Sequence, residues 1–438
     1  MTAQEKRNII IIGGGIIGCT TAYFLSHHPL YSPTTHRITL LEATDIASAA
    51  SGKAGGLLAL WAYPDSLVPL SFRLHAELAA RYDGPRRWGY RRLKCGSISA
   101  TVSSEKIASF TDKSPRGSVS TEATAIGAGT GDEKDWQKLP KQDEHAARLL
   151  EEAGVPPDLN WVDPETLEGY AEMGGPGTTD TAQVHPLEFT TAMAELAAEK
   201  GVEIRTGALV TLIKTTKTAV ERIEYIDRKT GETHTIEDFT DVVVCAGPWT
   251  GKLLPKTRVE GLRAHSVVFE ADVTPYAVFT DIVLPSDYVP PHRARKGQKR
   301  RHKGSVDPEV YARPNNEVYA CGEPDTTIPL PETADLVQTD PSQCDDLISY
   351  LSTISPALRA APIKARQACY IPRHMRFGDE RGPLVGPTSM KGLWVAAGHT
   401  CWGIQNGPAT GCLMAEWILE GRVRSADVVK LDPRTFKV

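Results

Sequence analysis

The chain has 438 residues, of which 41% are hydrophobic and 24% charged, and its formal net charge is −5 at pH 7. This length exceeds what one hydrophobic core usually holds, so we expect a soluble cytoplasmic protein of two domains. The charge balance gives no reason to expect nucleic acid as a partner, no apolar run is long enough to span a bilayer, and the N-terminus has no signal-peptide core.

The most informative motif follows the first apolar run, residues 9–12. It reads Gly13-Gly14-Gly15-Ile16-Ile17-Gly18, a G-x-G-x-x-G pattern, and a helical pattern begins directly after it. Strand, glycine motif and helix in this order are typical of dinucleotide binding, because the helix N-terminus offers free N–H groups to a pyrophosphate. Gly13 permits the tight turn, Gly15 lets the backbone approach the phosphates, and Gly18 lets helix and strand pack closely.

A second strand is predicted at residues 37–41, and it ends at Glu42-Ala43. An acidic residue at this place suits the two hydroxyls of a ribose and argues against a 2′-phosphate. A glycine-rich loop follows, with the run Ser51-Gly52-Lys53-Ala54-Gly55-Gly56-Leu57. Its small residues would let the backbone pass close to a bulky planar ligand.

Two segments are predicted to be insertions. Residues 103–135 are rich in Ser, Thr, Gly and Ala with little apolar periodicity, which predicts a mobile surface insertion. Residues 286–306 contain the one strongly basic stretch, 292–303. One interpretation of this stretch is a solvated loop tip, and the other is a contact with anionic lipid headgroups at a membrane periphery or with an acidic partner.

The other segments alternate between helical and strand patterns. Helices are expected at 67–82, 143–155, 186–200 and 408–419, and strands at 202–205, 208–213, 241–247, 262–285, 308–322 and 392–398. The run at 241–247 is apolar and enters a tight turn, as buried parallel strands do.

Five signals in this order resemble the D-amino-acid-oxidase-like FAD oxidoreductases, which include glycine oxidase, sarcosine oxidase and the fructosyl amino acid oxidases. They are the glycine motif with Glu42, the loop at 51–56, His185-Pro186 with the strand around Val210, the run 243–249, and the stretch 397–404. The resemblance implies an α/β fold with a Rossmann-type FAD-binding domain of the glutathione-reductase type and a second, mixed β-sheet substrate domain. It assigns residues 1–85, 182–260 and 362–438 to the first domain and 86–181 and 261–361 to the second.

The resemblance also implies FAD rather than NAD as the cofactor. The adenosine half is expected on the glycine motif, Glu42, Ala43 and Val210, with Ala246, Gly247 and Trp249 beside it, and the flavin half on the loop at 51–57 with Gly398, His399, Trp402, Gly403, Ile404 and Gln405. A helix that begins near residues 406–408 would direct its positive end at the flavin edge that gains negative charge on reduction.

The eight cysteines contain no C-x-x-C pair, which predicts reduced thiols rather than disulfides or a metal site. Cys369 matches the position through which sarcosine and fructosyl amino acid oxidases attach flavin. The Thr-x-x-Asp run that follows it in the family is missing, so a non-covalent FAD is favoured and a thioether is the alternative. Gln405 stands where sarcosine oxidase has an oxygen-activating lysine, and Cys401 where amino acid oxidases have a substrate-binding arginine.

No catalytic residue can be assigned from the sequence. The pocket candidates are Trp61, Tyr370, Arg373, Trp402 and Gln405. The aromatic candidates would exclude water, with core packing as the alternative, and Arg373 or Lys53 could bind a substrate carboxylate. His399 fits a residue of the flavin loop better than a general base, because no carboxylate is near it in sequence.

Three functions remain open at this point. The first is FAD-dependent oxidation of a C–N bond in a small amine or amino acid, by hydride transfer to flavin N5, with oxygen or another acceptor reoxidising FAD. The second is a flavoprotein with a trafficking role, because residues 311–323 look most like a fungal branch of the family with a member associated with late-endosome-to-Golgi transport. This alternative implies an endosomal association. The third is an NAD-linked reductase, which the lack of a second glycine fingerprint disfavours.

Overall fold

Strand β1 (Arg7–Ile12) lies inside a six-stranded sheet of the computed structural model, which describes residues 6–111, 154–299, 302 and 304–438. The strand order is β20-β21-β12-β1-β2-β8, and all neighbours are parallel except β20 and β21. The other strands are β2 (His36–Glu42), β8 (Glu203–Thr206), β12 (Asp241–Val244), β20 (Leu384–Pro387) and β21 (Leu393–Ala397).

The two faces of this sheet are covered by different elements, and the side chains of β1 point alternately to one face and the other. Ile9 and Ile11 face a core built with helices, whereas Ile10 and Ile12 face a small antiparallel sheet. The helices are α1 (Ile16–Ser26), α3 (Val68–Tyr82), α4 (Gly84–Trp88), α7 (Pro186–Glu199) and α12 (Gly403–Ala415); the small sheet has the order β11-β10-β9, with β9 (Ala208–Thr215), β10 (Val220–Asp227) and β11 (Thr233–Ile236). Burial on both faces explains why the last four residues of β1 are all isoleucine.

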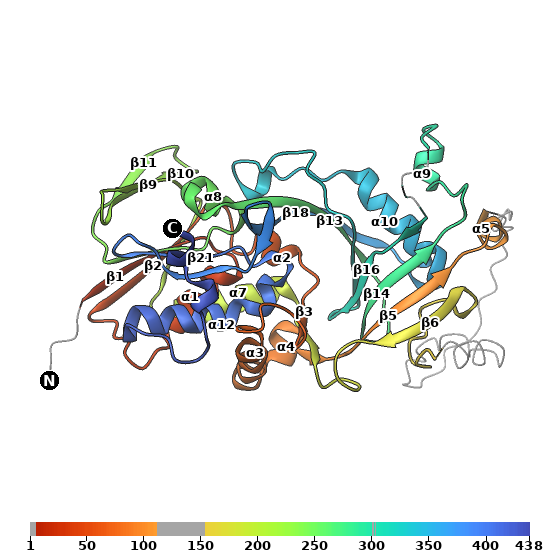
Figure 1. Ribbon diagram of the computed structural model, residues 1–438, viewed down its shortest axis with the longest axis horizontal. Helices are drawn as coiled ribbons and strands as arrows, with labels where there is room; N and C mark the ends of the chain where they lie inside the picture. Colours follow the sequence, from red (N-terminus) through yellow and green to blue (C-terminus); the bar gives the residue numbers. More distant parts are fainter. Residues whose placement is uncertain (1–5, 112–153, 300–301, 303) are drawn as a thin grey trace, which may run out of the picture.

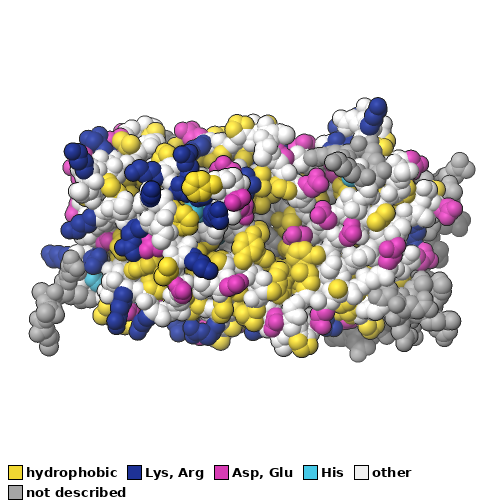
Figure 2. Space-filling view, in the orientation of Figure 1, with side chains coloured by type: hydrophobic (Ala, Val, Ile, Leu, Met, Phe, Trp, Pro, Cys, Tyr) yellow, Lys and Arg dark blue, Asp and Glu magenta, His cyan; other side chains and the backbone are white. Residues whose placement is uncertain are grey.

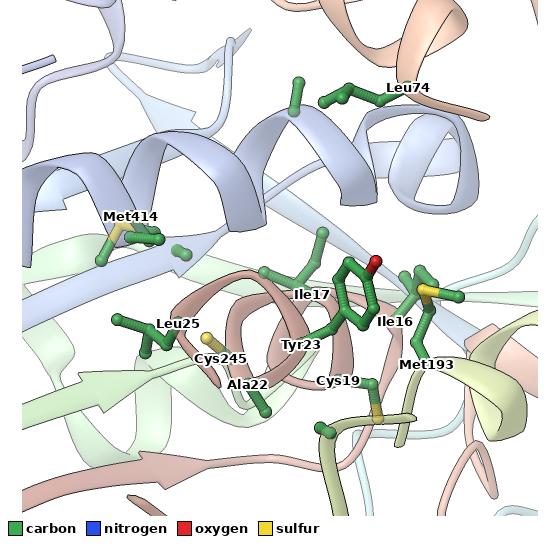
Figure 3. Close-up of a cluster of buried hydrophobic side chains, with 14 of the residues drawn as sticks. Ile16, Ile17, Cys19, Ala22, Tyr23, Leu25, Leu74, Met193, Cys245 and Met414 are labelled. Atoms are coloured by element: carbon green, nitrogen blue, oxygen red, sulfur yellow. The ribbon is translucent and has the colours of Figure 1, made fainter. Parts of the chain in front are cut away.

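Helix α1 is the centre of the helical layer and packs against α12, α7 and the turn after β12 (Figure 3). Its approach to α12 is close because α12 presents glycines to it. A Cβ atom on Gly411 would lie 2.5 Å from the backbone of Thr20, and the Thr20 hydroxyl donates to the Gly407 carbonyl oxygen at 2.8 Å. The position of the α1 N-terminus is therefore fixed by backbone-to-backbone packing.

A nine-stranded mixed sheet forms the other half of the molecule (Figure 1). Its order is β19-β18-β13-β17-β16-β14-β5-β6, with β15 beside β14. Its strands are β5 (Lys94–Thr101), β6 (Leu167–Glu172), β13 (Val259–Glu270), β14 (Tyr276–Val283), β15 (Ser305–Val306), β16 (Glu309–Arg313), β17 (Glu317–Cys321), β18 (Ile363–Arg376) and β19 (Asp379–Arg381). Helix α10 (Pro341–Ile354) packs on it and closes a second hydrophobic core, and α11 (Pro356–Ala360) follows α10.

Two long strands connect the halves. Strands β13 and β18 pair antiparallel along almost their whole lengths and run from the region of the six-stranded sheet into the nine-stranded one (Figure 1). A fourth sheet has the order β3-β7-β4, with β3 (Leu57–Ala59), β4 (Arg91–Arg92) and β7 (Thr181–Gln183). Other short helices are α2 (Ala50–Lys53), α8 (Thr250–Leu253) and α9 (Pro291–Ala294). The expected α/β fold class is confirmed. The division into two domains stays a prediction, and β18, from the last segment assigned to FAD binding, pairs within the nine-stranded sheet.

The predicted insertion at 103–135 begins with a helix, α5 (Ser104–Thr111), which its composition did not predict. The signal was a cap: the Ser103 hydroxyl oxygen accepts a hydrogen bond from the Lys106 backbone N–H at 3.1 Å. Residues 112–153, which include most of the helix predicted at 143–155, lie outside the described residues. None of the described helices is both long and apolar enough to cross a membrane.

The last helix begins at Gly403, which corrects the expected start at 406–408. Proline usually marks a first turn, but here Pro408 lies inside the helix, where its missing N–H leaves the Ile404 carbonyl oxygen without its helical donor. The imidazole Nε2 of His75 on α3 replaces that donor at 3.0 Å. Burial lowers the pKa of His75 to about 4, so the ring is neutral at pH 7 and can donate this proton.

Candidate active site

A cavity of about 850 Å³ opens at the carboxyl ends of the parallel strands. Its lining includes Gly13 after β1, Glu42 at the end of β2, Ala246 after β12 and Gly398 after β21. Ligands of open α/β sheets bind at this edge, where the chain leaves neighbouring strands in opposite directions. The cavity continues to the nine-stranded sheet, and hydrophobic side chains gather around the middle of the face between the two halves (Figure 2).

Most of the residues predicted to bind the cofactor are brought together in this cavity, although they come from distant parts of the chain. Those that line it are Gly13, Gly15, Ile16, Ile17, Glu42, Ala43, Ser51, Ala54, Gly55, Gly56, Leu57, Val210, Ala246, Gly247, Trp249, Cys369, Gly398, His399, Trp402, Gly403 and Ile404. Gly18, Gly52, Lys53 and Gln405 do not line it.

The nucleotide end of the cavity (Gly13, Gly15, Ile16, Ile17 and Glu42) is built mainly from backbone. Gly13 has φ +113°, and a Cβ atom there would lie 2.4 Å from the Cys245 carbonyl oxygen. A Cβ atom on Gly18 would lie 1.9 Å from the Gly13 carbonyl oxygen, so Gly18 allows close packing, as predicted, without lining the cavity. Gly15 caps α1 without a side-chain hydrogen bond, so the partial positive charge of this helix end faces the cavity and fits a pyrophosphate.

The Glu42 carboxylate is held in place by the glycine motif and by its own loop. Its Oε2 accepts from the Gly14 N–H at 2.6 Å, and its Oε1 accepts from the Thr44 N–H at 2.9 Å and from the Thr44 hydroxyl at 3.0 Å. A carboxylate has about four acceptor sites, so capacity remains for ribose hydroxyls. Glu42 and the N-terminus of α1, where the Ser51 hydroxyl oxygen accepts from the Ile16 N–H at 2.9 Å, together fit the adenosine half of FAD.

The glycine-rich loop passes between the two halves of the molecule. A Cβ atom on Gly55 would lie 2.2 Å from the ring of Tyr311, and one on Gly56, which has φ +83°, would lie 2.1 Å from the Val184 carbonyl oxygen. Lys53 faces away from the cavity, and its Nζ donates to the Ala368 carbonyl oxygen at 3.1 Å. Lys53 is therefore corrected from a cofactor or carboxylate ligand to an anchor of the loop.

A buried ion-pair network, which the sequence did not reveal, fixes the same loop. Arg313 donates to the Ala54 carbonyl oxygen at 3.0 Å and pairs with Glu317, which also contacts His185 at 3.4 Å and Lys364 at 2.5 Å. Although burial alone would raise it, the hydrogen bond from His185 and the Arg313 charge hold the pKa of Glu317 well below its usual range. The network couples the loop to strands β16 and β17.

The stretch after β21 places backbone and two buried polar side chains near the loop. His399 is bonded through Nε2 to the Thr410 hydroxyl at 3.0 Å, and burial lowers its pKa to about 3, so it is neutral at pH 7. Gln405 is fully buried on α12, and its Oε1 accepts from the Ala59 N–H at 2.8 Å. The helix starts early enough to turn Gln405 away from the cavity, which corrects the expectation that it contacts flavin.

Of the five pocket candidates, Trp402 alone lines the cavity. Trp61 packs behind it, 5.6 Å from its ring. Tyr370 points away because side chains alternate along β18, where Cys369 and Ile371 face the cavity, and its hydroxyl donates to the Ile328 carbonyl oxygen at 2.8 Å. Arg373 is paired with Glu260 at 2.8 Å, so it is not positioned for a substrate carboxylate.

The wall beside the glycine-rich loop, apart from Trp402, was missed by sequence reasoning. We call it the aromatic chamber, and its residues are Phe279, Glu309, Tyr311, Tyr319, Cys321 and Trp402. The Phe279 and Tyr311 rings lie 5.9 Å apart, and Tyr311 stacks on Tyr319 at 6.0 Å. Alternate positions of the predicted strands at 262–285 and 308–322 were the available signal, because residues two apart share a face.

The thiol of Cys369 lines the cavity, but its environment does not favour nucleophilic attack. Burial raises the pKa of Cys369 to about 11, and the thiolate is the reactive form. A covalent link to flavin stays a prediction that the geometry permits and the protonation state disfavours.

Known proteins are similar to this chain over most of its length. The family model for FAD dependent oxidoreductases of the DAO type matches residues 8–417. The chain is 34% identical to "Putative oxidoreductase TDA3" of Saccharomyces cerevisiae, covering 99% of this chain and 95% of the relative, and 33% identical to "Putative oxidoreductase C1F5.03c" of Schizosaccharomyces pombe, covering 98% of each. The solved structure of glycine oxidase from Bacillus cereus has a TM-score of 0.62 at 20% identity and covers 96% of both chains, which shows a shared fold. The chain therefore belongs to the DAO family of FAD-dependent oxidoreductases.

Proposed function

We propose that the chain oxidises the C–N bond of a small amine or amino acid, with oxygen or another acceptor reoxidising FAD. The observation that carries the proposal is one continuous cavity that joins the nucleotide end to the aromatic chamber. Solved structures with this fold include a glycine oxidase and an L-proline dehydrogenase, whose names state amine-bearing substrates. The aromatic chamber provides the apolar, concave site that a small substrate needs.

The chain's own residues would bind FAD, orient the substrate beside it and shield the site from water. The N-terminus of α1 and Glu42 would hold the adenosine half of FAD, and Gly55, Gly56 and the stretch from Gly398 to Ile404 the flavin half. When bound, FAD supplies the acceptor for a hydride from the carbon next to the nitrogen. The N-terminus of α12 at Gly403 lines the cavity and favours negative charge there, while Phe279 and Trp402 keep water out.

The test is the visible spectrum of the purified protein without oxygen, recorded before and after addition of single amines and amino acids. We expect flavin bands that at least one of these compounds bleaches. Flavin bands that no amine or amino acid bleaches would contradict the proposal and favour the trafficking alternative.

An endosomal association through residues 292–303 stays a prediction. Within this stretch Arg293 is paired with Asp346 by two hydrogen bonds of 2.5 Å, and His292 lies 3.3 Å from the same carboxylate, whereas Arg295, Lys296 and Lys299 are exposed. We expect replacement of these three exposed residues by Ser to reduce binding to vesicles that contain anionic lipid. Unchanged binding would contradict the membrane interpretation.

A further inference from the structure

Glu309 of the aromatic chamber has hydrogen-bond donors but no charged partner. Its carboxylate accepts from the Tyr311 hydroxyl and from the Cys321 thiol, with an Sγ–Oε2 distance of 3.7 Å. Both donors are neutral, and no Lys, Arg or His of the described residues forms an ion pair with Glu309. Burial raises the pKa of this carboxyl, as expected for an acid removed from water without a counter-charge.

The basic side chains around the cavity already have partners outside the aromatic chamber. Lys252 is the lysine in the lining, and its Nζ donates to the Leu330 and Pro331 carbonyl oxygens at 3.0 and 2.8 Å, beside Trp249 and away from the chamber. Arg373 is paired with Glu260, and Arg313 with Glu317. Among the described residues, none of these basic groups is placed to receive a carboxylate inside the aromatic chamber.

The rings of the chamber suit a positive charge. Phe279 lies 5.9 Å from Tyr311, and Trp61 holds Trp402 and Phe279 from behind at 5.6 and 5.9 Å. Aromatic faces attract ammonium groups through their quadrupole, and they do so more strongly where water is excluded. Tyr311 also touches the glycine-rich loop at Gly55, which connects the chamber directly to the expected flavin end of the cavity.

We propose that the aromatic chamber selects an amine that carries no carboxylate beside its nitrogen, with Glu309 as the counter-ion of the substrate's ammonium group. This inference rests on the proposed function, since it names the substrate class of the same site. An ammonium group would supply the positive partner that Glu309 lacks and would place its charge against the faces of Phe279, Tyr311 and Trp402. An amino acid would bring a second carboxylate towards Glu309 without a basic residue to balance it.

The binding test uses two probes that differ by one carboxylate. Phenethyltrimethylammonium carries the cation alone, and phenylalanine betaine carries the same cation with an α-carboxylate. The FAD-loaded protein is titrated with each by calorimetry, and changes in the flavin spectrum are followed in parallel. We expect the first probe to bind at least about tenfold more tightly. Equal or tighter binding of phenylalanine betaine would overturn the inference, and this comparison needs no variant.

Two variants test whether the binding of phenethyltrimethylammonium depends on Glu309. Glu309→Gln keeps the shape and the acceptor for Tyr311 but removes the charge, and we expect about tenfold weaker binding of phenethyltrimethylammonium. Asp287→Asn removes a charge from an exposed side chain after β14 and outside the cavity, and we expect unchanged binding. FAD content and circular dichroism of both variants are compared with the wild type. Retained affinity in a correctly loaded Glu309→Gln protein would overturn the role of Glu309.

An activity comparison separates this inference from the proposed function. Phenethylamine and phenylalanine are added without oxygen, and bleaching of the flavin bands is recorded. If both bleach the flavin equally, the proposed function stands and the selection against carboxylates is wrong. If neither compound, nor any other amine or amino acid, bleaches it while phenethyltrimethylammonium binding still depends on Glu309, the ammonium site stands and the proposed function is wrong.

Discussion

The two ends of the cavity are constructed in opposite ways. At the nucleotide end the groups that face a ligand are mostly backbone, exposed because Gly13 and Gly15 have no side chains. At the aromatic chamber they are side chains of Phe279, Glu309 and Tyr311, carried on the two paired strands β14 and β16. We therefore expect the nucleotide end to lose FAD binding when a side chain is added. We expect the aromatic chamber to lose ligand binding when a side-chain group is removed.

The largest effect is expected for Gly18→Ala. The new Cβ atom would lie 1.9 Å from the Gly13 carbonyl oxygen, so α1 must move away from β1. We expect a loss of about 3 kcal/mol in the free energy of unfolding, together with loss of bound FAD. Denaturant titration measures the first and flavin absorbance the second. The matched control is Gly169→Ala on β6, where no heavy atom lies within 4 Å of the added Cβ atom; equal effects of the two changes would contradict the packing argument.

The ion-pair network that couples the glycine-rich loop to strands β16 and β17 is tested by Glu317→Gln. This change leaves Arg313 without its buried counter-charge, and we expect a loss of about 2 kcal/mol of stability at pH 7. The pKa of Glu317 is lowered in the folded state, so its contribution is complete above the unfolded value of about 4.3 and is lost as the pH falls below it. Unfolding of wild type and variant is compared between pH 8 and pH 3. A stability difference that persisted unchanged at pH 3 would contradict the assignment.

A smaller effect is expected for Gly15→Val. The backbone here is extended (φ −78°, ψ −179°), so valine causes no backbone strain, but its Cβ atom would lie 3.0 Å from the Ser51 hydroxyl and its methyl groups would crowd this part of the cavity. We expect about tenfold weaker FAD binding with an unchanged fold. Fluorescence titration of the apoprotein with FAD measures the affinity, and circular dichroism checks the fold. Normal FAD affinity would show that the cofactor does not approach Gly15.

The smallest effect is expected for Tyr311→Phe, which keeps the ring and removes the hydroxyl that donates to Glu309. That hydrogen bond lowers the pKa of Glu309 against the effect of burial, so its removal should raise the pKa further. The other groups that face Glu309 are Asp307 and the thiols of Cys95, Cys321 and Cys401, and burial raises the pKa of each thiol. Binding of phenethyltrimethylammonium should therefore weaken on acidification at a higher pH than in the wild type. A shift to lower pH would contradict this sign.

The nucleotide end could be predicted from the sequence because its groups are local. One run of six residues supplies the turn, the helix start and the close packing, and Glu42 follows at the end of the next strand. The aromatic chamber could not be predicted, because it depends on strand register. Phe279 lies opposite Glu309, and Tyr311 opposite Tyr319, only once β14, β16 and β17 have paired.

The errors in the site have the same origin. Tyr370 and Gln405 are close in sequence to residues that line the cavity, but the alternation of β18 and the early start of α12 turn their side chains away. Arg373 and Lys53 were expected to be available cations, and both are used by partners far away in sequence, Glu260 and the Ala368 carbonyl. Proximity in sequence therefore located the cofactor site and could not determine the directions of individual side chains.

The paired strands β13 and β18 have a mechanical consequence. An antiparallel ribbon that continues from one sheet region into the other resists bending within its plane, because shearing would break several backbone hydrogen bonds together. We expect the two halves to behave elastically as one body rather than as two bodies about a hinge. Entry to and exit from the cavity would then depend on the loops at its rim, and their motion, rather than rotation of one half, would limit how fast ligands exchange.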